Sequence, residues 1–129
     1  MSDGDDVRYF DWVEYPHARV RVEIDKERGV PTRFVVQLER RVNGDWAEVV
    51  RFDHDPENPM GHDVVEDGLH MDVYRDGEKV RVKNDFPPVN LTQAPRYCVA
   101  YIEEHGGVLL RRFEQWHNLT PGESGRKNP

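Results

Sequence analysis

The stretch TRFVVQLERRVNGDWAEVVRFD, residues 32–53, contains two strand-like runs joined by a turn sequence. In the first run Phe34, Val36 and Leu38 recur at every second position, which is the period of a strand with one buried face. Asn-Gly between two such runs is one of the strongest short-range signals for a hairpin. We therefore expect an antiparallel hairpin over residues 33–53.

The register of this hairpin depends on the length of its loop. A three-residue loop sets Arg40 opposite Glu48, whereas a two-residue loop sets Glu39 opposite Glu48. Like charges that face each other destabilise a sheet, so we expect the three-residue loop. The same register sets Leu38 opposite Val50, with both side chains in the core.

Further strands extend the hairpin into a sheet. Val20, Val22 and Ile24 alternate with charged residues, which predicts a strand and a hairpin over residues 18–42. Residues 8–17, RYFDWVEYPH, are a candidate for one more strand before it.

A third hairpin is predicted over residues 69–83, where MDVY and EKVRVK flank an Asp-Gly turn. With a two-residue loop, Asp72 faces Arg81 and forms an ordinary cross-strand ion pair.

The C-terminal part has helical periodicity. Ala94, Cys98 and Ile102 recur at three to four residues, which predicts a helix over about 92–105. A Gly-Gly pair interrupts the pattern, and apolar residues then recur in a second helix or a kinked continuation over about 107–117.

The predicted fold is therefore α+β, with an antiparallel sheet of about five strands packed by one or two C-terminal helices. We expect a single domain over residues 9–117, between an acidic tail at 1–8 and a polar tail at 118–129.

Composition limits the classes of function. A chain of 129 residues suffices for one core, and its net charge of -7 makes it a poor general binder of nucleic acid, although a local basic patch remains allowed. Neither a signal peptide nor an apolar run of about 20 residues is present, so we expect a cytoplasmic location and no membrane contact.

Candidate functional side chains gather in RFDHDPENPMGHDVVEDGLHMDVY, residues 51–74. If the two flanking strands are neighbours, five side chains converge on one face beside the polar loop that carries His62: Arg51, Asp53, His70, Asp72 and Tyr74. Histidines can act as general acid and base while arginine stabilises charge on a phosphate, so the candidate catalytic residues are Arg51, Asp53, His62 and His70.

Two other interpretations of this stretch stay open. Imidazoles and carboxylates also bind divalent metal ions, and the candidate ligands are His54, His62, His70 and Asp72. No cofactor is required by the sequence, and the stretch matches no metal-binding motif of known spacing. A solvated acidic loop would explain the same residues without any function.

Three short motifs resemble the TumE-type toxins of type II toxin-antitoxin systems and their small archaeal and bacterial relatives. They are Val49-Val50-Arg51-Phe52-Asp53, Gly61-His62 and His70-Met71-Asp72, within a similarity over residues 33–105. The chain differs from that pattern at His54, where asparagine is common, in a longer loop and in an inserted hairpin. The resemblance implies a toxin with an RNA-directed activity and a helix-turn-helix antitoxin partner.

Rival functions come from two other classes. A non-enzymatic module would present its sheet face or an edge strand to a protein partner, and a homodimer stays open as well. A metal-dependent enzyme would use the histidines and aspartates as ligands.

Overall fold

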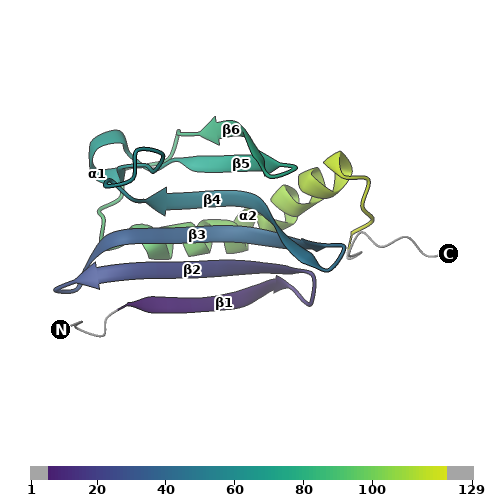
Figure 1. Cartoon of the computed structure of the whole chain (residues 1–129), viewed down its shortest axis with the longest axis horizontal. Helices are drawn as coiled ribbons and strands as arrows, with labels where there is room; N and C mark the ends of the chain where they lie inside the picture. Colours follow the sequence, from purple (N-terminus) through teal and green to yellow (C-terminus); the bar gives the residue numbers. More distant parts are fainter. Residues whose placement is uncertain (1–5, 122–129) are drawn as a thin grey trace.

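The computed structural model describes residues 6–121 and shows one sheet with one long helix behind it (Figure 1). Six antiparallel strands follow one another across the sheet in chain order. The elements are β1 (Val7–Glu14), β2 (Ala18–Glu27), β3 (Val30–Val42), β4 (Asp45–His54), α1 (Val64–Asp67), β5 (Met71–Arg75), β6 (Glu78–Lys83) and α2 (Ala94–Trp116).

The core lies between α2 and the sheet. Alternate residues of the strands point to the helix, among them Val22 on β2, Val36 on β3 and Phe52 on β4, all buried. Cys98 and Ile102 of α2 pack against them and are fully buried. Among residues 6–121 no helix or strand covers the other side of the sheet, which we call the open face (Figure 1).

The predicted α+β class with an antiparallel sheet is confirmed, with six strands instead of about five. The additional strand is β1, which overlaps the candidate stretch at 8–17 and begins one residue before it, inside the expected N-terminal tail. Residues 1–5 of that tail and residues 122–129 of the C-terminal tail lie outside the described residues. Neither helix within residues 6–121 is long and apolar enough to cross a membrane.

The β3–β4 register is correct in the core but wrong near the turn. Leu38 does pair with Val50, yet the loop has two residues and Glu39 faces Glu48. Asn43 and Gly44 both have positive φ, as a tight hairpin turn requires. A β-bulge that leaves Val49 unpaired restores the register beyond the turn.

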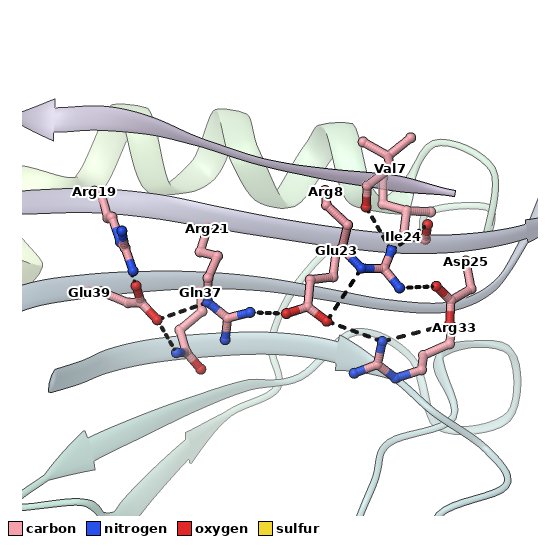
Figure 2. Close-up of polar contacts among 10 residues, drawn as sticks. All are labelled: Val7, Arg8, Arg19, Arg21, Glu23, Ile24, Asp25, Arg33, Gln37 and Glu39. Atoms are coloured by element: carbon pink, nitrogen blue, oxygen red, sulfur yellow. Dashed lines mark hydrogen bonds and ion pairs between the residues drawn. The ribbon is translucent and has the colours of Figure 1, made fainter. Parts of the chain in front are cut away.

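The expected repulsion at Glu39 is compensated by cations on β2 (Figure 2). Its carboxylate lies 2.8 Å from Nε of Arg19 and 3.0 Å from Nε of Arg21. Gln37 donates a further hydrogen bond of 2.6 Å to the same carboxylate. Because two arginines of the neighbouring strand β2 neutralise Glu39, its repulsion by Glu48 does not force a longer loop.

The β5–β6 register differs from the prediction by one residue over most of its length. A β-bulge leaves Val80 unpaired, so Val73 faces Arg81 and Asp72 faces Val82. The predicted ion pair between Asp72 and Arg81 is therefore wrong, since the bulge turns Arg81 to the helix side of the sheet.

The C-terminal segment forms one continuous helix of 23 residues and not two. The Gly-Gly pair lies inside it, and the reason is packing against β1. A Cβ atom on Gly106 would lie 2.9 Å from Cγ1 of Val13, so a residue without a side chain lets α2 approach that strand closely. The helix does not break at these glycines as expected, and Gly106 instead allows close contact between α2 and β1.

Candidate functional site

The candidate site lies on the open face where β4 meets β5. Arg51 of β4 pairs with Asp72 of β5, and Asp53 lies two residues farther along β4 on the same face. The loop after β4 brings His62 onto these side chains, and His70 precedes β5. The four candidate catalytic residues therefore do come together.

His62 lies between two carboxylates. Its Nε2 is 3.0 Å from Oδ1 of Asp72 and 3.9 Å from Oδ1 of Asp53. The two aspartates use their other oxygens for cations: Oδ2 of Asp72 is 3.2 Å from Nζ of Lys79, and Oδ2 of Asp53 is 3.8 Å from Nε of Arg51. Both Oδ1 atoms thus lie near His62, in what we call the Asp53–His62–Asp72 centre.

Both carboxylates of this centre are buried. The side chains of Asp53 and Asp72 are 7% and 4% exposed. Burial raises the pKa of Asp53, and the negative charge of Asp72 adds to that effect, while His62 and Arg51 oppose it. Oδ1 of Asp53 is buried without a hydrogen-bond partner among the described residues, which is costly for a folded protein.

His70 stacks on His62, with ring centroids 4.9 Å apart and planes at 11°. Nδ1 of His70 lies 3.1 Å from the carbonyl oxygen of Gly68. Since a carbonyl only accepts hydrogen bonds, Nδ1 carries the hydrogen and the neutral ring keeps a lone pair on Nε2. That nitrogen is able to accept a proton from a substrate.

The loop that carries His62 is held by its own backbone. The amide of Asp55 donates to the carbonyl of His62 over 2.8 Å. Asp63 then caps α1, where its Oδ1 accepts hydrogen bonds from the amides of Val65 and Glu66. A Cβ atom on Gly61 would lie 2.5 Å from the carbonyl oxygen of Asp55, so glycine is required for this closure.

His54, a candidate metal ligand, does not join the site. It lies on the helix side of β4, buried, and its ring stacks on Phe34 with centroids 6.0 Å apart. Its Nδ1 accepts a hydrogen bond of 3.0 Å from the amide of Val64. Burial lowers its pKa, so the ring is held neutral in a structural role.

Sequence reasoning placed Tyr74 on the face of the site but missed the pairing of Lys79 with Asp72. Lys79 binds Asp72, because the bulge at Val80 displaces the expected partner. Burial raises the pKa of the half-buried Tyr74, and the nearby charge of Asp72 adds to the shift. No pattern in the sequence marks the bulge, so the pairing of Lys79 with Asp72 had no signal there.

A second cluster of potential ligands, Glu14, His17 and Glu114, lies at the opposite end of the sheet. Arginines occupy it: Nε of Arg40 is 3.0 Å from Oε2 of Glu114, and Arg111 contacts both glutamates. This cluster is a partly buried ion-pair network, and its arginines already neutralise the glutamates.

Comparison with known proteins places the chain in a family. No curated protein and no solved structure matches it with significance. The resemblance to TumE-type toxins therefore stays a prediction. One family model, described as a domain of unknown function, DUF7718, matches residues 1–119. Because this match covers nearly the whole sequence, the chain belongs to the DUF7718 family.

Proposed function

We propose that this protein is a small enzyme that cleaves phosphodiester bonds in RNA, with its active site around Arg51, Asp53, His62 and His70. One observation carries the proposal: a stacked pair of histidines lies beside two buried carboxylates and two cations on the open face. Such a gathering of acid, base and charge-stabilising groups is typical of catalytic sites.

His70 is the acid–base group that substrate can reach. Nε2 of His62 faces Asp72 and Asp53, whereas Nε2 of His70 keeps a free lone pair. Asp72, and not Asp53, is the carboxylate that orients His62, because it lies closer to Nε2 of that histidine.

RNA is the favoured substrate because it carries its own nucleophile. His70 takes the proton of the ribose 2′-hydroxyl, and the oxygen attacks phosphorus. The bond from phosphorus to the 5′-oxygen breaks, and that oxygen takes a proton from solvent water. Arg51 and Lys79 supply N–H donors for the negative charge that develops on the phosphoryl oxygens.

The experiment compares an RNA oligonucleotide with the all-deoxy strand of the same sequence. Cleavage of RNA to a 2′,3′-cyclic phosphate, with the deoxy strand intact, is the expected result. Arg51→Ala should slow cleavage at least about tenfold, whereas the control Arg96→Ala, at an exposed position on α2, should not. Equal cleavage of both strands, or none of either, would overturn the proposal.

The resemblance to TumE-type toxins supports a cellular role as the toxin of a toxin-antitoxin pair, bound by a helix-turn-helix antitoxin. Strong expression without the partner should then slow growth. The double variant Arg51→Ala with His70→Ala should relieve that effect. Unimpaired growth under full induction of the wild-type chain would exclude this role.

A non-enzymatic interaction module is the second candidate function, and exposed aromatic residues favour it. Phe10 and Trp12 of β1 are 46% and 43% exposed on the open face, and the guanidinium of Arg19 lies 4.1 Å from the ring of Trp46 beside them. Aromatic residues and arginine dominate the binding energy of protein interfaces. A protein partner that needs Trp12 but tolerates His70→Ala, with no RNA cleavage by the wild type, would establish this alternative.

A further inference from the structure

We propose that the Asp53–His62–Asp72 centre binds one divalent transition-metal ion, through Oδ1 of each aspartate and Nε2 of the histidine. This inference rests on the proposed function, since the ion would serve the same reaction.

The spacing of the three atoms fits a shared ion. All three lie within 4.8 Å of one another, and Nε2 of His62 is 3.0 Å from Oδ1 of Asp72. Ligands that each lie about 2.1 Å from one ion are separated by roughly 3.0–3.4 Å in tetrahedral or octahedral geometry. The distance from Nε2 of His62 to Oδ1 of Asp53 is longer, 3.9 Å, so this pair would have to move closer to share an ion.

An unpartnered buried atom points to a ligand independently of this spacing. Oδ1 of Asp53 accepts no hydrogen bond among the described residues, although its side chain is only 7% exposed. Folded proteins satisfy nearly all such atoms, because desolvation of an unpaired carboxylate oxygen is expensive. A cation at the centre supplies the missing partner.

The surroundings orient the ligands. Lys79 and Arg51 hold the Oδ2 atoms, so the Oδ1 atoms turn toward the centre. The stacked ring of His70 limits the rotation of His62. Neighbouring residues that orient the ligand side chains in this way are a general feature of metal sites.

The Glu14–His17–Glu114 cluster shows the contrast. Its atoms are equally close, but Arg40 and Arg111 neutralise the glutamates there, and Arg40 is fully buried. In the Asp53–His62–Asp72 centre the cations bind only the outer oxygens. The Glu14–His17–Glu114 cluster is therefore an internal control for the Asp53–His62–Asp72 centre.

The donor set selects the class of ion. One imidazole nitrogen with two carboxylate oxygens suits Mn²⁺, Fe²⁺ or Zn²⁺. An ion bound there would act as a Lewis acid toward a phosphoryl oxygen held by Arg51.

The test is calorimetric titration of the full chain, treated with a chelator and dialysed, with MnCl₂ and separately with ZnCl₂. We expect one equivalent to bind with a dissociation constant below 100 μM, about −5.5 kcal/mol. Asp53→Asn and His62→Gln should each weaken binding at least about tenfold, as loss of a ligand does at metal sites. His17→Gln, in the arginine-filled cluster, should bind like the wild type.

Circular dichroism establishes that each variant is folded before titration. Equal affinity in Asp53→Asn and the wild type, or no binding of either ion at 1 mM, would overturn the metal site. If the titration shows no metal binding and RNA is still cleaved in the presence of a chelator, the metal site is refuted and the proposed function stands. Metal binding without RNA cleavage, with either ion present, would instead refute the proposed function and leave the site standing.

Discussion

Nε2 of His62 lies 3.0 Å from Oδ1 of Asp72, although the two residues are ten positions apart in the chain with a short helix between them. The contact joins the loop after β4 to the first half of β5. It depends on Gly61, whose lack of a side chain allows the loop to close on Asp55. Through this contact an acidic loop becomes part of a defined site.

Asp53→Asn should stabilise the metal-free protein by about 1 kcal/mol, a typical gain for a single stabilising substitution. The substitution removes a buried negative charge that lies near Asp72, and the raised pKa of Asp53 indicates that its ionised form is disfavoured in the fold. Stability is often sacrificed at functional sites in this way. Urea unfolding at neutral pH measures the difference, and a lower unfolding midpoint in the variant would contradict it.

Arg40→Met should destabilise the protein by about 3 kcal/mol, because it removes the buried partner of the Glu114 carboxylate and leaves only the more exposed Arg111 beside it. The side chains of Arg40 and Glu114 are both almost fully buried. The double variant with Glu114→Leu should lose less than Arg40→Met alone. Chemical denaturation of the wild type, the two single variants and the double variant tests this, and additive losses would show that the pair is not coupled.

Glu39 should make stability depend on pH in the acid range. Burial acts to raise the pKa of Glu39, but hydrogen bonds from Arg19 and Arg21 outweigh it and lower the pKa. A lowered carboxyl pKa contributes stability that is present above the ordinary value of 4.5 and is lost as the pH falls through the folded value.

Glu39→Gln removes this contribution. The free energy of unfolding of the variant should therefore fall less steeply below pH 4.5 than that of the wild type. At neutral pH the variant should be about 1–3 kcal/mol less stable, because charged hydrogen bonds are lost. Parallel pH profiles for the two proteins would refute this role of Glu39.

The two helical glycines should respond differently to alanine. Gly107 has open space around it, so Gly107→Ala should stabilise α2 by about 0.5–1 kcal/mol. Gly106→Ala should gain less, because its Cβ would press on Val13. Thermal unfolding of both variants makes the comparison, and a larger gain at Gly106 would contradict the close packing of β1 on α2.

The parts of the fold that follow from local periodicity could be predicted from sequence. Val20, Val22 and Ile24 alternate over a strand because a sheet with one buried face imposes a period of two. The bulges at Val49 and Val80 could not be predicted, since an extra residue in one strand depends on contacts with its neighbours.

The candidate site was predictable to a similar extent. Arg51 and Asp53 share a face by alternation alone, and the histidines could be placed near them. The distinct roles of His54 and His62 could not be separated, because they depend on how the loop folds around Gly61. The partner of Asp72 could not be predicted, because the bulge turns Arg81 away and Lys79 takes its place.

The most direct test of the proposed active site is the rate of RNA cleavage by His70→Ala against a matched histidine control. His105→Ala is that control, because His105 lies on α2 with a side chain that is 44% exposed. We expect His70→Ala to slow cleavage at least about 100-fold, as loss of a general acid or base does, and His105→Ala to leave the rate unchanged. Cleavage by His70→Ala at the wild-type rate would contradict the assignment of this site.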